Sequence, residues 1–246
     1  MVLIKIKQTM NQKLKITGII LFASFVFLSS CEVGEEPGPL ATEERILSAF
    51  DGIHVETIGK VNLHVAQEFR VVIHTHANVL DDITLSIFEE DLSIRLNGKH
   101  TKIDRLEIDV YAPEYTSIKL DGVADIRCRE LITTSQLSIE QDGVGNIYLA
   151  DIDVQKASFR LDEVGDVVVE GHAGEIAAIH DGVGNLRLFG LSGKKGDCKL
   201  SGTGNIEINV SDYLKIDLNG VGDIRYMGTP SMNVNHTGIG KIVKVN

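Results

Sequence analysis

Acidic and amide side chains recur beside glycine at nearly regular intervals through the second half of the chain. The recurring segments read LDGVADI, QDGVGNI, LDEVGDV, HDGVGNL, LSGTGNI, LNGVGDI and HTGIGKI. We number positions within each segment, so that the third position is the G of LDGVADI. One polar column stands just before this third position, and another stands three residues after it. The first holds Asp121, Asp142, Asp162, Asp181, Ser201, Asn219 and Thr237, and the second holds Asp125, Asn146, Asp166, Asn185, Asn205, Asp223 and Lys241. Because Ca²⁺ prefers carboxylate and carbonyl oxygens, a row of calcium sites is one chemistry that these columns could support.

The same columns also fit a structural role, in which Asp and Asn cap backbone amides at tight corners. Carboxylates stacked about 4.8 Å apart repel one another by about 1 kcal/mol in water, which would favour a bound cation. In the second column, however, Asp and Asn largely alternate, so an Asn amide can donate to a neighbouring Asp. Calcium-binding β-rolls repeat every nonapeptide, and this repeat is about twice as long. We therefore expect capping, with no metal and no cofactor.

Histidines are the other candidate metal ligands. His74 and His76 alternate along a predicted strand and therefore point to one face, where two imidazoles could begin a metal site. No nearby carboxylate or cysteine spacing supports such a site, so a solvated strand face is the favoured interpretation. His180 and His236 stand in a column otherwise held by leucine, and we expect them to be partly buried corner residues.

The sequence singles out no catalytic group. It contains no G-x-S-x-G elbow, no H-E-x-x-H motif and no phosphate-binding loop. A basic cluster beside acids would suit cleavage of acidic polysaccharides, but the column of Arg127, Arg187 and Arg225 is interrupted by other residues. The chain also lacks Trp, the best sugar-stacking side chain. We expect a protein that is not an enzyme. A polysaccharide-degrading β-helix enzyme remains an alternative, ranked below the two binding and structural roles given at the end of this section.

The repeat predicts the fold. Its third positions are spaced by 21, 20, 19, 20, 18 and 18 residues, and they are Gly122, Gly143, Glu163, Gly182, Gly202, Gly220 and Gly238. Seven copies at a period near 19 indicate a solenoid, in which each unit buries its apolar side against the next. Right-handed winding is the default for parallel crossovers. We therefore predict an all-β, right-handed parallel β-helix or β-solenoid with coils of about 19 residues.

Apolar and glycine columns support this stacking. Three aliphatic columns, expected to face inward, stand four residues before, one after and four after the third position. They are Ile118, Ile139, Phe159, Ala178, Cys198, Ile216 and Val234; Val123, Val144, Val164, Val183, Thr203, Val221 and Ile239; and Ile126, Ile147, Val167, Leu186, Ile206, Ile224 and Ile242. A further column stands two residues after the third position of each segment. It holds Ala124, Gly145, Gly165, Gly184, Gly204, Gly222 and Gly240, and glycine there predicts a positive φ or close backbone approach at a turn.

The N-terminal part of the chain divides into three segments. Residues 1–30 have a basic start and a 13-residue apolar run, which is too short to span a bilayer and typical of a signal peptide. The run ends in Leu28-Ser29-Ser30-Cys31, which resembles a bacterial lipobox and predicts lipidation of Cys31. Residues 31–44 are acidic and predict a linker. Residues 45–115 alternate with period two and predict strands continuous with the repeat region, 116–246.

Two cysteines lie within the predicted fold. An exported protein meets an oxidising compartment, so a Cys128–Cys198 disulfide has to be considered. The repeat separates the two residues by four coils, about 19 Å, whereas a disulfide needs Cα atoms within about 7 Å. We expect free, buried thiols.

The repeated corner behind a lipoprotein signal resembles the family of auto-transporter adhesins with a head GIN domain. The segments GVGNI (Gly143 to Ile147), GVGNL (Gly182 to Leu186) and GTGNI (Gly202 to Ile206) carry the resemblance, together with the Phe50-Asp51-Gly52-Ile53 segment. It implies an envelope protein of Gram-negative bacteria with a β-helix-like fold and no catalytic residues. The sequence departs from the pattern at Ala124, Glu163 and Lys241.

We therefore expect a surface-exposed outer-membrane lipoprotein that acts as an adhesin or binding module for a protein or glycan, with an envelope scaffold as the alternative. Its net charge of −11, which becomes −15 without the four lysines of residues 1–30, opposes binding of nucleic acid. The expected partners are the membrane, through the lipid on Cys31, an unknown surface ligand, and a second copy of the chain. Open coil ends expose backbone and apolar side chains, which favours self-association.

Overall fold

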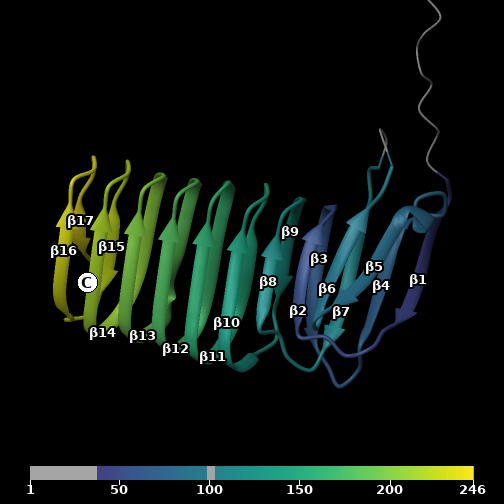
Figure 1. Cartoon of the computed structure of the whole chain (residues 1–246), viewed down its shortest axis with the longest axis horizontal. Coiled ribbons are helices and arrows are strands. Elements are labelled where there is room, and N and C mark those ends of the chain that lie inside the picture. The colour runs from purple at the N-terminus through teal and green to yellow at the C-terminus, as the bar shows by residue number, and fades with distance from the viewer. Residues whose placement is uncertain (1–37, 99–102, 246) are drawn as a thin grey trace, which may run out of the picture. The chain divides into compact units, whose positions relative to one another are not determined.

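The computed structural model describes residues 38–98 and 103–245, which form an all-β body of parallel coils stacked one on the next (Figure 1). Apart from a short 3-10 turn, Leu80–Asp82, every regular element of these residues is a β-strand. Within the described ranges no helix is long and apolar enough to cross a membrane. The predicted signal peptide, Cys31 and most of the predicted linker lie outside these ranges.

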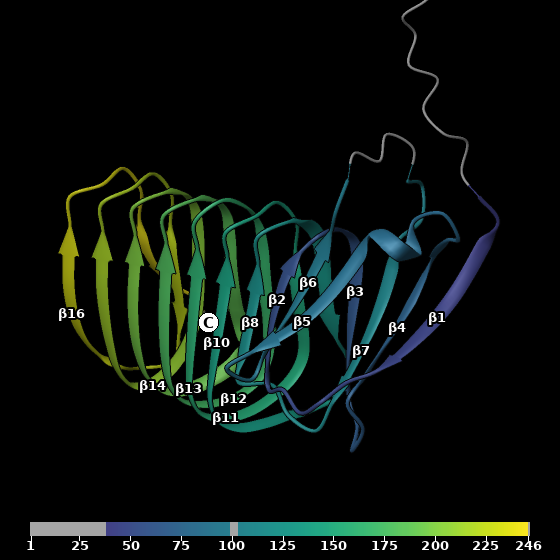
Figure 2. The ribbon, with the colours of Figure 1, turned by 45° about the vertical axis from the view of Figure 1, so that its right-hand side comes forward.

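The repeat region winds as predicted. Long strands bend at bulges, so that one strand serves two sides of its coil (Figure 2). Neighbouring coils pair in parallel, which confirms the solenoid. The strands are β8 (Ser117–Leu120), β9 (Val123–Cys128), β10 (Ile132–Gln141), β11 (Ile147–Leu161), β12 (Val164–His180), β13 (Val183–Leu200), β14 (Thr203–Leu218), β15 (Ile224–Met227), β16 (Ser231–His236) and β17 (Ile242–Lys244).

Two of the three predicted aliphatic columns form the core. Ile126 pairs with Ile147, Ile147 with Val167, and the register continues through Leu186 and Ile206 to Ile242. The column that begins at Ile118 stacks in the same way on the neighbouring side of each coil. Like residues therefore lie over like residues, and all but the last coil, where Val234 is 46% exposed, bury these side chains and gain stability from it.

The third predicted column faces outward, so that part of the prediction is wrong. Val123 is 59% exposed and Val183 is 53% exposed, whereas Ile126 is fully buried. The reason is strand geometry, because successive side chains point to opposite faces. Val123 stands three residues before the inward Ile126 and therefore lies on the outer face. Apolar character in every coil was not evidence of burial here.

The N-terminal region contributes further coils and an antiparallel segment. Strand β2 lies between β6 and β8, and β3 lies between β7 and β9, all in parallel pairing. Beyond them, β4 pairs antiparallel with both β7 and β1, and β5 pairs antiparallel with β6. The strands are β1 (Leu40–Ile46), β2 (Gly52–Glu56), β3 (Ile58–Val65), β4 (Arg70–His76), β5 (Ile83–Phe88), β6 (Asp91–Leu96) and β7 (Glu107–Ala112).

Strand β1 corrects the predicted linker, since residues 40–44 of that segment are part of a sheet. Its side chains are exposed or half-buried throughout, so no buried apolar face marks it in the sequence. Backbone pairing with β4 holds it instead. Arg45 adds two hydrogen bonds, from Nη1 to the Ile83 carbonyl at 2.5 Å and from Nη2 to the Leu80 carbonyl at 2.9 Å.

Both cysteines within the described residues are free and buried, as predicted. Cys128 pairs in register with Leu149, and Cys198 lies between Ala178 and Ile216. Burial raises the pKa of the Cys128 thiol to about 12 and also raises the pKa of Cys198. Both thiols are therefore protonated at neutral pH and act as small core side chains.

Candidate ligand-binding groove

The corner of each coil depends on glycine. Gly145, Gly165 and Gly184 have φ of +142°, +155° and +143°. A Cβ on Gly145 would lie 1.9 Å from the Ala124 carbonyl oxygen of the preceding coil. Glycine therefore meets two demands here, a backbone conformation that L-residues rarely adopt and contact between the backbones of adjacent coils. The glycine at the third position meets only the second demand, and Glu163 replaces it in one copy.

The Asp/Asn column three residues after the third position forms a continuous hydrogen-bonded ladder. The Asn146 amide N–H donates to Asp125 Oδ1 at 3.0 Å, and the Asp166 N–H donates to Asn146 Oδ1 at 3.1 Å. The same backbone contact continues coil by coil to Lys241, whose N–H donates to Asp223 Oδ1 at 2.9 Å. These side chains cap backbone amides of the next coil, so the corner needs no cation to hold it together.

Three of the four Asp residues in the column just before the third position pair with basic side chains. Lys119 Nζ lies 2.9 Å from Asp142 Oδ2. Arg160 lies 2.6 Å from Asp162 and 3.6 Å from Asp181. These contacts relieve the repulsion between stacked carboxylates, which was the main argument for calcium.

Two polar side chains are fully buried beneath the corners. Gln141 Nε2 donates to the carbonyls of Gly143, Gly145 and Val164. His180 occupies the equivalent place, and its Nε2 lies 2.7 Å from the Gly184 carbonyl. Burial lowers the pKa of His180, so its imidazole is neutral at neutral pH. We expected His180 to be only partly buried.

His76 does not lie on a solvated face, which corrects the prediction for that residue, whereas the His74 side chain is 31% exposed. His74 Nε2 lies 3.0 Å from Asp109 Oδ2, and His76 is buried with Nδ1 2.6 Å from the Gly38 carbonyl oxygen and Nε2 2.5 Å from Asp104. Both nitrogens of His76 face acceptors, and the Asp104 contact raises its pKa, so the imidazolium is favoured. His236 is exposed rather than partly buried.

His64 joins this network, although the sequence analysis did not single it out. Its Nδ1 lies 3.0 Å from Glu130 Oε1, its Nε2 lies 3.3 Å from Asp109 Oδ1, and its ring stacks on Tyr111. Burial raises the pKa of Asp109, but hydrogen bonds from Asn62, His64 and His74 outweigh it and hold that pKa below its ordinary value. The alternation of His64 with buried Leu63 and half-buried Val65 places it on the outer face, which was the available signal.

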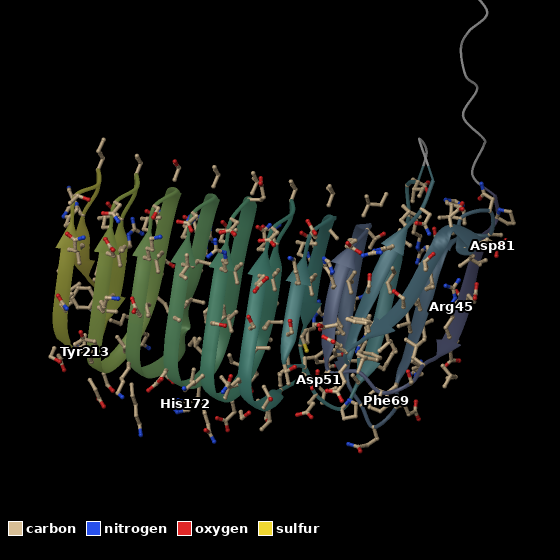
Figure 3. The ribbon with its side chains drawn as sticks, viewed as in Figure 1. Arg45, Asp51, Phe69, Asp81, His172 and Tyr213 are labelled. Atoms are coloured by element: carbon tan, nitrogen blue, oxygen red, sulfur yellow. The ribbon has the colours of Figure 1, made fainter. Side chains whose placement is uncertain are left out.

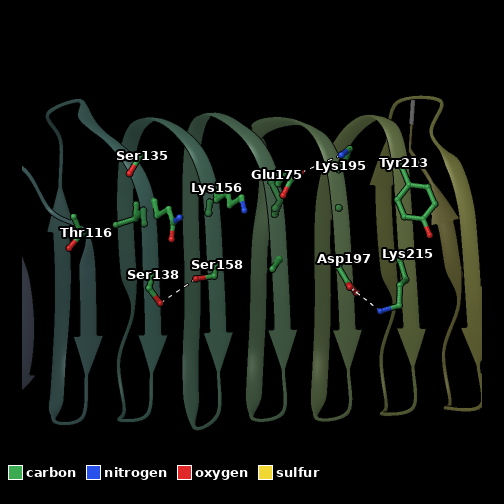
Figure 4. A pocket seen from close by; sticks show the side chains of 16 residues that line it. Thr116, Ser135, Ser138, Lys156, Ser158, Glu175, Lys195, Asp197, Tyr213 and Lys215 are labelled. Carbon is green, nitrogen blue, oxygen red and sulfur yellow. Dashed lines mark hydrogen bonds and ion pairs between the residues drawn. The ribbon is translucent and has the colours of Figure 1, made fainter.

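A groove of about 690 Å³ is lined by residues of six successive coils, from Thr116 to Lys215 (Figure 4). Its floor carries small side chains, among them Ser138, Ser158 and Ala177, which stack in register. One rim is a second column, whose members are Gln136, Lys156, Glu175, Lys195 and Tyr213. Tyr213, which is partly exposed, lies near the C-terminal end of the stack (Figure 3). The groove runs along the stacking direction because each coil contributes one side chain to each column.

The groove offers hydroxyl and ammonium groups. Ser158 Oγ donates to Ser138 Oγ at 3.2 Å, Lys195 pairs with Glu175 at 3.3 Å, and Lys215 pairs with Asp197 at 2.9 Å. Within the described part of the chain no acidic group lies within ion-pair distance of Lys156. The groove thus has one uncompensated cation in a strongly acidic protein, and its polar atoms are of the kind that bind hydroxyl and carboxylate oxygens.

The family described as "Putative auto-transporter adhesin, head GIN domain" matches residues 49–230, most of the chain and nearly all of the solenoid. The chain belongs to this family. Membership indicates an adhesin-like protein with a cell-surface or extracellular location.

Solved structures agree with the fold of this head GIN domain. A putative adhesin from Bacteroides fragilis NCTC 9343 superposes with a TM-score of 0.83 at 26% identity, covering 86% of this chain and 100% of that one. A putative adhesin from Parabacteroides merdae ATCC 43184 gives 0.60 at 20% identity, covering 84% and 96%. A putative lipid binding protein from Parabacteroides distasonis ATCC 8503 gives 0.69 at 19% identity, covering 85% and 98%. No curated protein matches the chain.

This head GIN domain also has a second groove, about 650 Å³, along the glycine corners. The exposed column of Val164, Val183, Thr203, Val221 and Ile239 forms one wall, and the polar column from Asp162 to Thr237 forms the other. Between them lies backbone, with glycine in most coils. We call the exposed column from Val164 to Ile239 the aliphatic ridge. We expected these side chains in the core and therefore did not predict the ridge.

Proposed function

We propose that this head GIN domain protein is a cell-surface lipoprotein adhesin, a binding module without catalytic activity, which holds an extended polymer in the groove lined by Ser138, Ser158 and Lys156. One observation carries the proposal: the groove runs along six successive coils, each of which contributes side chains to it, with hydroxyl and ammonium groups among them. A compact small molecule would touch only one or two coils, whereas a polymer strand would use all of them.

A glycan is the ligand that we favour for the groove. Serine hydroxyls and lysine ammonium groups donate hydrogen bonds to sugar hydroxyls and carboxylates, and the exposed ring of Tyr213 offers a flat face for stacking. The net charge of −11 disfavours nucleic acid. A polypeptide in extended form is the alternative occupant, and the test includes it.

The test is an array of glycans and matrix proteins probed with the purified chain. A Lys156→Ala/Tyr213→Ala double variant should bind the best glycan at least about tenfold more weakly, which corresponds to about 1.4 kcal/mol. Arg225→Ala removes an exposed cation on another face and should bind normally. Equal binding by the double variant, or binding to proteins alone, would refute the glycan groove.

Absence of catalysis is tested on the same ligands. We expect the bound glycan to be recovered intact after prolonged incubation, with no new reducing ends. Turnover that disappears in groove variants would instead establish the polysaccharide-degrading alternative.

The anchor is a separate part of the proposal. It rests on the sequence alone, because Cys31 follows the apolar run directly. Metabolic labelling with a fatty acid should label the chain, and Cys31→Ser should abolish the label and release the protein from the outer-membrane fraction. Protease treatment of intact cells would show whether the domain faces outward.

An envelope scaffold is the second candidate, and the aliphatic ridge favours it. Val123 and Ile239 are 59% and 74% exposed, and Met232 and Val234 on β16 are also exposed. Aliphatic surface of this kind favours self-association. Light scattering at high concentration should then show dimers or larger species that revert to monomer when Val164, Val183 and Val221 become Thr. A monomeric native chain would remove this candidate.

A further inference from the structure

Three potential metal ligands meet where the N-terminal coil contacts the first repeat. His54 and Glu56 stand two residues apart on β2 and therefore share its outer face. Asp121 comes from the corner after β8, and its N–H donates to the Val55 carbonyl at 2.9 Å. Parallel pairing of β2 with β8 fixes this approach, because Val55 lies opposite Leu120.

The ligand atoms are spaced as a small divalent cation requires. His54 Nε2 lies 3.4 Å from Asp121 Oδ2 and 3.8 Å from Glu56 Oε1. All three atoms lie within 4.8 Å of one another. Tetrahedral zinc with bonds of about 2.0–2.1 Å separates its ligand atoms by about 3.3 Å. Small side-chain adjustments would close this shell, and no backbone movement is needed.

Arg95 and Ser93 hold the Glu56 carboxylate in place, and Arg95 Nη2 donates to Oε1 itself, whose second lone pair remains for a cation. Arg95 donates to Glu56 from Nε and, at 3.1 Å, from Nη2, and Ser93 Oγ donates to the same carboxylate at 3.0 Å. These contacts lower the pKa of Glu56 and keep it ionised. Lys119, the register partner of His54, reaches away to Asp142 in the following coil. The three candidate ligands remain accessible to solvent, with side-chain exposures of 27%, 24% and 45%.

Asp121 differs from the other acidic residues of its column. Asp142 pairs with Lys119, and Asp162 and Asp181 pair with Arg160. Among the described residues, Asp121 instead contacts an imidazole and lies beside a second carboxylate from the neighbouring coil. Like charges at adjacent positions of paired strands repel, and a divalent cation bound to both carboxylates removes that repulsion.

We propose that His54 Nε2, Glu56 Oε1 and Asp121 Oδ2 bind a divalent transition-metal ion of the Zn²⁺ class, with water in the fourth position. Imidazole combined with carboxylates suits Zn²⁺ and its neighbours Co²⁺ and Ni²⁺ better than Ca²⁺ or Mg²⁺, which take oxygen ligands. The ion joins the N-terminal coil to the first coil of the repeat region. Its open position is available to an oxygen atom of a surface ligand.

The experiment is titration of the metal-free purified chain with ZnCl₂ by calorimetry and with CoCl₂ by visible absorption. The wild type should bind one equivalent of Zn²⁺ at this site, and Co²⁺ should give the intense visible bands of four-coordination. His54→Gln and Asp121→Asn should each weaken Zn²⁺ binding at least tenfold and abolish those bands.

Matched controls separate this site from adventitious binding. His172→Gln changes an exposed histidine that contacts Ser192, and Asp142→Asn changes the next acid of the same corner column; both should bind Zn²⁺ normally. Circular dichroism should show native spectra for all variants. Absence of stoichiometric Zn²⁺ binding, or binding that survives in the His54→Gln/Asp121→Asn double variant, would overturn the proposal.

Discussion

The repeat region and the N-terminal region build the same solenoid by different means. From β8 to β17 every pairing is parallel, and one corner design recurs with its glycines and Asp/Asn ladder. From β1 to β7 parallel coils alternate with antiparallel strands, and ionic contacts such as His76–Asp104 and Arg95–Glu56 replace the ladder. Both regions are held by strand pairing and a buried apolar core, but the repeat region adds the amide ladder, whereas the N-terminal region adds individual ionic contacts.

The largest expected effect is at the glycine corner. Gly184→Val should destabilise the repeat region by about 3 kcal/mol or more, because φ is +143° and a Cβ would lie 1.8 Å from the Gly165 carbonyl oxygen. Chemical denaturation followed by circular dichroism measures the loss. Gly190→Ala is the control, since the added Cβ meets only the flexible Glu170 side chain. Equal effects of the two changes would show that the corner has no special steric demand.

The ladder should give the next largest effect. Asn205→Ala leaves the Asp223 N–H without its acceptor at 3.0 Å, and we expect a loss of about 1–2 kcal/mol. Asn235→Ala serves as the comparison, because Asn235 only donates to the exposed Asp217 carboxylate at 3.0 Å. It should cost less than about 0.5 kcal/mol. The same denaturation measurement on both variants decides whether amide capping stabilises the repeat.

Acid should weaken the repeat region through His180. Burial lowers its pKa in the folded state, so below the ordinary value of about 6.5 the unfolded chain binds the extra proton more readily. The free energy of unfolding should fall as pH drops through this window. His180→Gln should remove that dependence, because a Gln amide can donate to Gly184 as Gln141 does to Gly145. Unchanged pH dependence of thermal unfolding in this variant would exclude His180 as the cause.

The N-terminal region should show the opposite sign through His76. Its pKa is raised by the hydrogen bond to Asp104, so this contribution is complete below about pH 6.5 and is lost as pH rises through the raised value. His76→Gln should flatten the alkaline side of the stability curve, and because it also removes the contact that lowers the pKa of Asp104, it should flatten the strongly acid side too. Hydrogen exchange of β1 and β4 amides, corrected for intrinsic rates, provides the local measurement. Loss of protection on acidification from neutral pH to about pH 5, where Asp104 stays ionised, would contradict this assignment.

The smallest expected effect tests the outward valines. Val183→Thr should change stability by no more than about 0.5 kcal/mol, because the side chain is 53% exposed. Val167→Thr buries a hydroxyl in the core and should cost about 1–3 kcal/mol. Thermal unfolding of the pair compares two columns that look alike in the sequence and lie on opposite faces of one coil.

The periodic spacing of residues allowed the fold of the repeat region to be predicted. The prediction missed features of the N-terminal region, where the spacing is not periodic. The register of Ile126, Ile147 and Val167 and the separation of Cys128 from Cys198 followed from spacing alone. The corner Thr57-Ile58-Gly59 was missed, although Ile58 and Gly59 pair with Val123 and Ala124. An insertion that contains β4 to β7 separates this corner from the next one, so its spacing matches no other copy.

The candidate sites were less predictable than the fold. The groove depends on the curvature of a coil, and a column of Ser and Ala gives no sign of concavity in the sequence. His54, Glu56 and Asp121 meet only because β2 pairs with β8 across a long stretch of sequence. Contacts of that kind follow from topology, which alternation within single strands does not specify.

The ladder of Asp125, Asn146 and Asp166 also has a consequence for how such a molecule can change in length. Each internal rung donates its backbone N–H to the preceding coil and accepts the N–H of the following coil with its side-chain oxygen. Removal or duplication of one whole coil would therefore leave all other rungs intact. A groove built this way would grow or shrink by one coil height, about 4.8 Å, at each such event. Evolution could therefore match its length to a longer or shorter polymer without redesigning any corner.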